Sequence, residues 1–130
     1  FPPGDAKHTA MAYPYSDYLR SVLIETAKEI NLKFHEKGTV VTIEGPRFST
    51  RAESEMFRIW GADVINMSIA PETILANEAR LPYAAVAMST DYDCWKDDEA
   101  PVTWDEILKI FSQNVNNVIA LLINVIKKIQ

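Results

Sequence analysis

Cysteine is almost absent from this chain of 130 residues. Cys94 is the only one, so no disulfide can form within the chain. Disulfides are rare in reducing compartments, and a cytoplasmic location is therefore the simpler expectation. We predict that Cys94 is a small buried residue rather than a nucleophile.

Basic residues are too few and too scattered to form a nucleic-acid surface. Lys and Arg number 13 against 18 Asp and Glu, which gives a formal net charge of −5. Neutralising a phosphate backbone requires clustered cations. Lys127 and Lys128 are adjacent, but a helix C-terminus explains them, since cations are favoured there. We expect no nucleic-acid partner.

Long apolar runs are also missing. The most apolar stretch, Val118 to Ile126, is too short to span a membrane and is interrupted by Asn124. A secretory signal is not evident either, so we expect no membrane partner. Hydrophobic residues nevertheless make up 48% of the chain and are spread along it, which predicts one domain with a modest core.

The chain does not begin with methionine. Its first residues, Phe1-Pro2-Pro3-Gly4-Asp5, are typical of a loop. We expect that an amino-terminal portion is missing or is carried on a companion chain.

What is present is an alternation of strand and helix patterns. Predicted strands cover residues 40–43, 62–67 and 83–88, and predicted helices cover residues 17–31, 51–60, 71–79 and 103–126. Capping boxes at Thr50-x-x-Glu53 and Thr103-x-x-Glu106 mark two of the helix starts. Residues 97–101 are expected to form an acidic loop. The pattern predicts an α/β fold with a mixed, largely parallel sheet flanked by helices.

The segment from Thr42 to Glu53 joins a strand to a helix through the Gly45-Pro46 turn. Helix starts leave backbone N–H groups unpaired and carry the positive end of the helix dipole. A polar or anionic ligand could use these groups just behind Phe48 and Ser49. The alternative interpretation is a helix cap with no ligand.

Polar side chains follow all three predicted strands. These are Ser49, the pair Met67-Ser68, and the run Thr90-Asp91-Tyr92-Asp93. Ligands of open α/β sheets bind beyond the carboxyl ends of the strands, so the three segments are expected to converge on one site. Polar residues are also common in ordinary loops, which is the competing explanation.

Asp91 and Asp93 are two positions apart, which places both carboxylates on one side of an extended chain. Two carboxylates in one partly desolvated pocket can share a proton and provide a donor as well as an acceptor. That combination suits adenine, whose N7 accepts and whose 6-amino group donates a hydrogen bond. A solvated acidic turn is the alternative. A metal site is weaker, because no histidine and no calcium-loop glycine accompany the pair.

Taken together, the run from Thr42 to Glu53, the triplet Asn66-Met67-Ser68 and the run from Ala87 to Trp95 resemble the purine nucleoside phosphorylase family. The likeness is closer to its methylthioadenosine phosphorylase branch and extends from about His8 to the chain end. It implies that residues 1–130 are the C-terminal portion of a single phosphorylase domain. It further implies phosphorolysis of 5′-methylthioadenosine to adenine and 5-methylthioribose 1-phosphate, with inorganic phosphate as co-substrate and no metal or organic cofactor.

The resemblance also implies roles for individual residues. Asp91, assisted by Asp93, would bind purine N7 and the 6-amino group. Further substrate contacts would come from Phe48 stacking on the base, Ser49 at the base edge, Thr90 in the matching string, Met67 at the ribose, Ser68 at phosphate, His8 across a subunit interface, and Trp104 and Ile107 in the region of the 5′-pocket. Relatives that cleave 6-oxopurines have Glu where Ser49 stands, which favours a 6-aminopurine here. Trp104 is bulkier than the small aliphatic residue of close relatives, which puts the 5′-substituent in doubt.

Two other functions stay open at this point. The substrate could be adenosine or another purine nucleoside, or the chain could be a non-catalytic half that is active only with a partner segment. Family members are longer, and their first half carries a Gly-rich phosphate loop that this chain lacks. The family also implies a homo-oligomer built from trimers.

Overall fold

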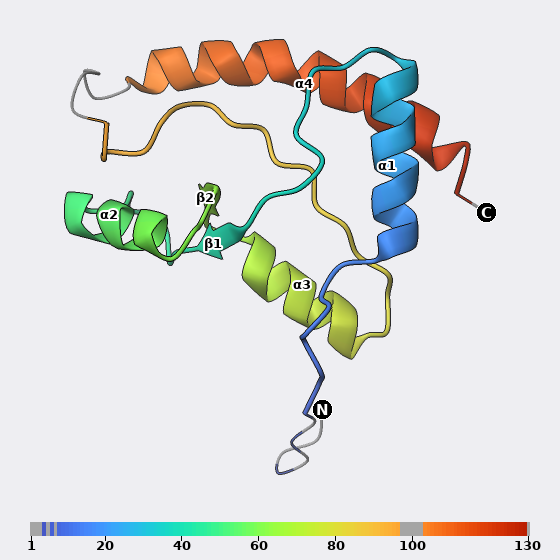
Figure 1. Cartoon of the computed structure of the whole chain (residues 1–130), viewed down its shortest axis with the longest axis horizontal. Coiled ribbons are helices and arrows are strands. Elements are labelled where there is room, and N and C mark those ends of the chain that lie inside the picture. Colours follow the sequence, from blue (N-terminus) through green and yellow to red (C-terminus); the bar gives the residue numbers. More distant parts are fainter. Residues whose placement is uncertain (1–3, 5, 7, 97–102, 130) are drawn as a thin grey trace.

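The computed structural model describes residues 4, 6, 8–96 and 103–129, with the side chain of Gln113 left out. Figure 1 shows six elements in the order α1 (Asp17–Glu29), β1 (Val40–Thr42), α2 (Arg51–Ile59), β2 (Val64–Asn66), α3 (Ile69–Glu78) and α4 (Trp104–Ile126). Within these residues no helix is both long and apolar enough to cross a membrane. The predicted acidic loop over residues 97–101 lies outside the described residues.

Local sequence signals account for the helix ends. The Ser16 hydroxyl accepts a hydrogen bond from the Leu19 amide at the start of α1, and Asn31 follows the helix with a φ of 55°. Both predicted capping boxes form, at the starts of α2 and α4. Gly61 follows α2 with a φ of 79°, a conformation that glycine adopts without a steric penalty.

The sheet that the structure describes consists of β1 and β2, paired in parallel with Val40 opposite Val64 and Thr42 opposite Asn66. The helix α2 connects them, so the three elements form a βαβ unit, the usual connection between parallel strands. This confirms the predicted parallel pairing and the α/β class.

The predicted strand over residues 83–88 is wrong, because that segment is not a strand in the structure. A strand is defined by ladder hydrogen bonds to a neighbour, and none of the described segments provides that ladder. The segment is held at its ends instead. The Tyr83 carbonyl accepts from the Ser16 amide at 2.8 Å, and the Asn114 side chain of α4 donates to the Ser89 carbonyl at 3.4 Å.

The main hydrophobic core lies where α1 packs against the C-terminal part of α4 (Figure 1). Its buried members are Val22 and Ala27 from α1 and Leu121 and Val125 from α4. Ile43 and Phe57 are buried in the βαβ unit. The first half of α4 extends beyond this core, and its Leu108 and Phe111 are exposed. Much of the apolar surface of this chain therefore remains uncovered.

Candidate functional site

The loop between β1 and α2 carries Phe48 and Ser49. This loop and α2 both contact the segment of Cys94 and Trp95. The Cys94 thiol donates to the Ser49 carbonyl at 3.5 Å, across 45 positions of sequence. The Arg58 guanidinium of α2 lies 3.9 Å above the Trp95 ring, close enough for a cation–π contact. The loop that follows β1 thus lies against the segment that carries Asp91 and Asp93, although that segment does not follow a strand in the structure.

Met67, just after β2, reaches the same loop. A β-carbon added at Gly45 would lie 2.6 Å from the Met67 sulfur, so the thioether packs directly on the glycine. The absence of a side chain at Gly45 is what permits this approach. Ser68 follows Met67 as the N-cap residue of α3, and the structure therefore places segments from all three predicted strand ends near one another.

The two carboxylates differ in their surroundings. Asp91 is exposed and accepts a hydrogen bond from the Thr90 hydroxyl at 2.6 Å. Asp93 is half-buried, and its Oδ2 atom is buried with no hydrogen-bond partner among the described residues. A buried carboxylate oxygen without a donor is costly, so a donor from outside the described residues is expected at this atom. The shared proton stays a prediction.

Cys94 is exposed, so the predicted buried position is wrong. The residue lies in a turn next to the site rather than in a packed element, and turns run over the surface. Partial burial, followed by the charge of Asp93, raises the pKa of the Cys94 thiol. The thiol stays protonated and acts as a hydrogen-bond donor, which agrees with the expectation that it is not a nucleophile.

The start of α2 is closed by Glu53. Its carboxylate accepts from the Thr50 amide at 2.8 Å, and the Thr50 hydroxyl accepts from the Glu53 amide at 3.2 Å. Arg47 holds the pKa of Glu53 at about 2, with further help from the hydrogen bonds of Thr50. The predicted capping box thus occupies the amides of Thr50 and Glu53, the first with the Glu53 carboxylate and the second with the Thr50 hydroxyl, so these two amides are not open to a ligand.

The start of α3 is organised by two residues that the sequence analysis did not single out. The Thr42 hydroxyl donates to the Asn66 Oδ1 atom at 2.8 Å and accepts from the Ala70 amide at 3.1 Å, and the same Asn66 atom accepts from the Ile69 amide at 3.3 Å. Strand side chains thus satisfy the first amides of α3, and the helix begins before Pro71, earlier than predicted.

Because Thr42 and Asn66 cap α3, Ser68 makes no capping bond to the helix. Its hydroxyl contributes, after the Tyr83 hydroxyl, to lowering the pKa of Glu72. The signal that could have found Thr42 and Asn66 was their position as polar residues at the ends of two paired strands.

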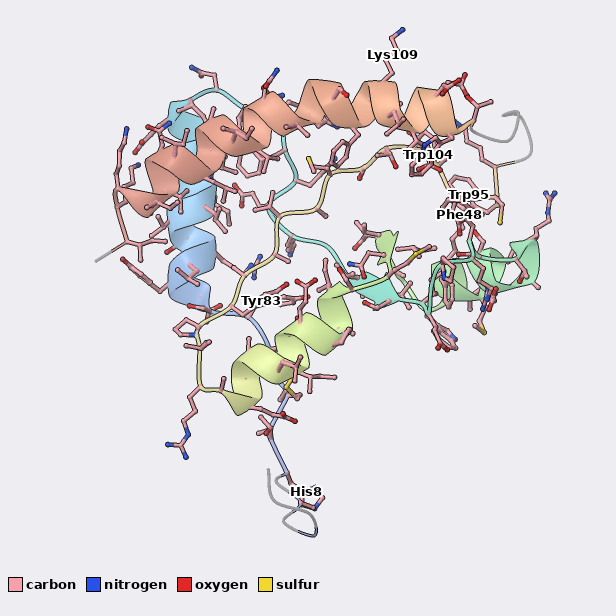
Figure 2. All side chains as sticks on the ribbon, turned by 180° about the vertical axis from the view of Figure 1, so that it is seen from behind. His8, Phe48, Tyr83, Trp95, Trp104 and Lys109 are labelled. Atoms are coloured by element: carbon pink, nitrogen blue, oxygen red, sulfur yellow. The ribbon has the colours of Figure 1, made fainter. Side chains whose placement is uncertain are left out.

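The remaining predicted residues lie farther apart. Figure 2 shows Phe48, Trp95 and Trp104 toward one end of the molecule and His8 on the opposite, amino-terminal side. His8 is exposed, and the described chain does not bring it to the other predicted residues. Trp104, 65% exposed, and the half-buried Ile107 lie in the first turns of α4.

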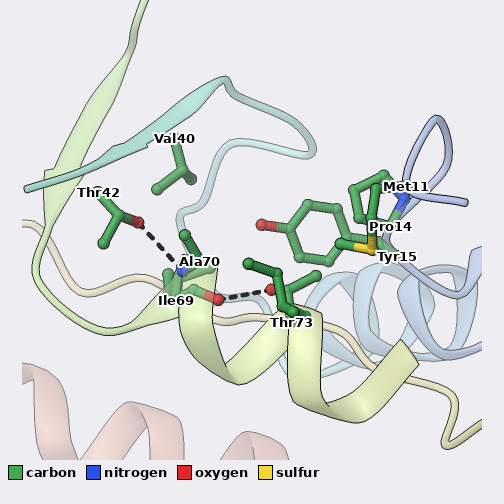
Figure 3. Close-up of a pocket in the computed structure, with 9 residues that line it drawn as sticks. Met11, Pro14, Tyr15, Val40, Thr42, Ile69, Ala70 and Thr73 are labelled. Atoms are coloured by element: carbon green, nitrogen blue, oxygen red, sulfur yellow. Dashed lines mark hydrogen bonds between the residues drawn. The ribbon is translucent and has the colours of Figure 1, made fainter. Parts of the chain in front are cut away.

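A cavity of about 290 Å³ lies elsewhere, between the N-terminal segment, β1 and α3 (Figure 3). Its lining is mostly apolar and consists of Met11, Pro14, Tyr15, Val40, Thr42, Ile69, Ala70, Thr73 and Ile74. None of the predicted site residues lines it. Across the residues that the structure describes, no group of three or more His, Cys, Asp or Glu side chains is arranged to hold a metal ion.

The model of the phosphorylase superfamily matches residues 1–127. This chain belongs to that superfamily. It is 52% identical to the S-methyl-5′-thioadenosine phosphorylase of Xenopus tropicalis, with 94% of this chain and 43% of the relative covered. The corresponding enzyme of Danio rerio is 53% identical, with 98% and 45% covered. These relatives confirm the predicted family and its methylthioadenosine phosphorylase branch.

Solved structures agree with the superfamily assignment. The methylthioadenosine phosphorylase of Schistosoma mansoni in complex with adenine superposes with a TM-score of 0.88 at 36% identity, with 94% of this chain and 48% of that chain covered. The chain thus spans less than half the length of these curated relatives and about half of this structure.

Proposed function

We propose that the complete protein catalyses phosphorolysis of 5′-methylthioadenosine, giving adenine and 5-methylthioribose 1-phosphate, and that this chain supplies the base and ribose part of the site. The observation that carries the proposal is the contact between the Ser49 loop and the Asp93–Cys94 segment. It brings the loop that carries the Phe48 ring and the Ser49 hydroxyl against the segment that carries the two carboxylates. Two relatives that share about half of their aligned residues with this chain are named S-methyl-5′-thioadenosine phosphorylase, which supports this substrate.

In the proposed reaction, a phosphate oxygen attacks the anomeric carbon on the face opposite the base. A carbon–oxygen bond forms as the bond to N9 of adenine breaks, through an oxocarbenium-like transition state. Phosphate is the nucleophile, so the protein has to orient the reactants and stabilise the departing purine. Asp91, as an acid or hydrogen-bond partner of N7, would relieve the charge that builds on the base.

The base contacts follow from the two carboxylates and the loop. The assisting role of Asp93 rests on the resemblance and on its carboxylate being an acceptor, because the 6-amino group of adenine is a donor. The ring of Phe48 is 69% exposed and free to stack on the base, with Ser49 at its edge. Met67 would contact the ribose, Ser68 would bind phosphate, and Thr90 would contact the substrate. Trp104 and Ile107 would line the 5′-pocket. His8 would reach a neighbouring subunit.

The proposal includes a companion segment that supplies the phosphate ligands outside this chain. The Xenopus relative is more than twice as long as the part of it that this chain covers. In addition, large apolar side chains of this chain remain exposed on α4 and on or next to α2, among them Ile59, Trp60, Phe111, Ile123 and Ile126. Large apolar side chains that gather on a protein surface are normally covered by another protein segment. We propose that the companion segment and further copies, in a homo-oligomer built from trimers, cover them.

The test is to combine this chain with the part of the Danio rerio relative that it does not match, and to assay phosphate-dependent release of purine. We expect release from methylthioadenosine that exceeds release from inosine, and none without phosphate. Preference for inosine would overturn the argument from Ser49 and the aspartates. Full activity of the isolated chain would overturn the claim that a companion is needed.

Adenosine is the second candidate substrate. Trp104 is a bulky residue in the region of the 5′-pocket, and narrowing that pocket would favour the smaller 5′-hydroxyl group. The same assay decides, since adenosine turnover above that of methylthioadenosine would establish this alternative. If the recombined protein cleaves a nucleoside and the isolated chain does not, the chain is a half that is active only with a partner segment. If neither nucleoside is cleaved in the recombined protein, the proposed function is wrong.

A further inference from the structure

The carboxylate of Glu53 is bound from both ends of the loop that carries Phe48 and Ser49. Arg47, before the loop, donates to it through both terminal nitrogens, at 2.8 Å to Oε2 and 2.7 Å to Oε1. Thr50, after the loop, donates to Oε2 through its amide at 2.8 Å and its hydroxyl at 2.9 Å. The Arg47 guanidinium also donates to the Phe48 carbonyl at 3.1 Å. One side chain therefore closes the loop into a ring.

Of the two residues inside this ring, Phe48 is not held by burial. The Phe48 side chain is 69% exposed, so packing within this chain cannot fix its direction. The Ser49 carbonyl has its contact with the Cys94 thiol, which links the ring to the segment of Asp91 and Asp93. The spacing between the ring and the two carboxylates depends on the backbone of residues 47–50 keeping its shape.

We propose that Glu53, acting through Arg47, is a positioning residue that holds Phe48 and Ser49 at the separation from Asp91 and Asp93 that an adenine base requires. This inference rests on the proposed function of the same site. Glu53 and Arg47 need not touch the substrate, because they act through the loop backbone. A bidentate arginine–carboxylate pair suits this task, since its two parallel hydrogen bonds fix orientation as well as distance.

A helix cap alone does not explain the arrangement. The capping box of α2 is complete with Thr50 and Glu53, and Arg47 lies outside the helix. An exposed ion pair adds little to stability, so the Arg47 contact is explained better by the shape of the loop than by the stability of the fold. The same helix offers a matched comparison in the pair Arg51–Glu55, an exposed ion pair at 3.7 Å that does not close the loop.

The experiment uses the complete protein, in which this chain is joined by its companion segment, and the variants Arg47→Met, Glu53→Gln and both together. Gln keeps an acceptor for the Thr50 amide, so Glu53→Gln removes the charged pair while retaining the cap. We expect each single variant to weaken adenine binding about tenfold, measured by calorimetry, because small displacements of positioning groups are costly. The KM for phosphate and the thermal midpoint should stay near the wild-type values.

The double variant should bind adenine no more weakly than either single variant, since the two residues act as one unit. Glu55→Gln should bind adenine like the wild type. Faster hydrogen exchange at the amides of residues 48 and 49 in both single variants would show the loosened loop without any assay of activity. Exchange and adenine affinity that match the wild type would overturn the positioning role.

The two proposals fail in different ways. If the wild type binds adenine and cleaves the nucleoside while the variants do so equally well, the proposed function stands and the positioning role is wrong. If the wild type neither binds adenine nor releases it, the proposed function is wrong and the role assigned to Glu53 falls with it, whatever hydrogen exchange shows.

Discussion

The sulfur atom of Met67 lies against Gly45, so closely that a β-carbon at position 45 would be 2.6 Å from it. This contact ties the end of β2 to the turn that follows β1. Met67 is 38% exposed beyond the contact, which leaves part of its side chain open to a ligand. The position of a predicted ribose contact is thus set by a glycine in another segment.

Gly45→Ala should displace the Met67 side chain and weaken nucleoside binding. Methionine is flexible, so the side chain can move away and the loss of stability should be small. We expect the KM for the nucleoside in the complete protein to rise about tenfold, as is typical of a displaced substrate contact. Gly38→Ala is the control, because its β-carbon would meet Asp63 at 3.4 Å, an ordinary contact. An unchanged KM for Gly45→Ala would show that Met67 does not contact the ribose.

Thr42→Val should destabilise the start of α3. The substitution keeps the shape of the side chain but removes the donor to Asn66 and the acceptor for the Ala70 amide. Losing these bonds should lower the free energy of unfolding by about 1 kcal/mol, measured by urea denaturation of the complete protein. Thr42→Ser retains the hydroxyl and should lose less. Equal stability of the two variants would contradict the capping role.

Asp91→Asn should slow phosphorolysis by roughly 10²–10⁴-fold, the usual effect of losing a general acid. The side chain is exposed, so the thermal midpoint should not change. Asp17→Asn, in the first turn of α1, is a control that removes an acidic charge from a helix that Figure 1 shows well apart from α2. Turnover of Asp91→Asn at the wild-type rate would exclude Asp91 from the mechanism.

Tyr83 should titrate far above the usual range of tyrosine. Burial, followed by the hydrogen bond that its hydroxyl donates to Glu72 at 2.7 Å, raises its pKa to about 12 from an ordinary value of 10.0. Because the folded state holds the proton more tightly, the stabilisation is complete below pH 10 and is lost as the pH rises toward 12.

The ultraviolet absorbance of tyrosinate, compared between the wild type and Tyr83→Phe, measures this step directly. Glu72→Gln should lower the pKa of Tyr83 only part of the way, since burial is the larger cause. A Tyr83 titration near 10 in the wild type would contradict the burial and the hydrogen bond together.

The sequence predicted those features that depend on neighbouring residues. The capping boxes at Thr50 and Thr103 and the helix end at Gly61 need only a few consecutive positions, and all three are present. The strand expected over residues 83–88 depends on a distant partner that the local pattern does not specify. The small apolar residues of this segment are typical of a buried strand, but the pattern gives no information on whether a partner strand lies beside it.

For the candidate site, the sequence predicted which segments meet but not how they are held. The ends of β1 and β2 converge because the two strands are parallel neighbours, and the contact between Gly45 and Met67 agrees with this. The contact between Ser49 and Cys94 joins the β1 end to a segment that does not follow a strand. The cap that Thr42 and Asn66 provide for α3 depends on the register of two strands, which becomes known only when the strands are paired. The exposed position of Cys94 was not predicted, because cysteine is usually buried and its residue type gives no sign that this one lies in a surface turn.

The two-stranded ladder of β1 and β2 has a practical consequence for work with this chain. Each strand pairs with the other along one side, and no described segment forms a ladder along the outer sides. Unprotected strand edges recruit strands from other molecules. Expressed alone, the chain should therefore tend toward inclusion bodies, and co-expression with the proposed companion segment is the better route to material for crystallisation.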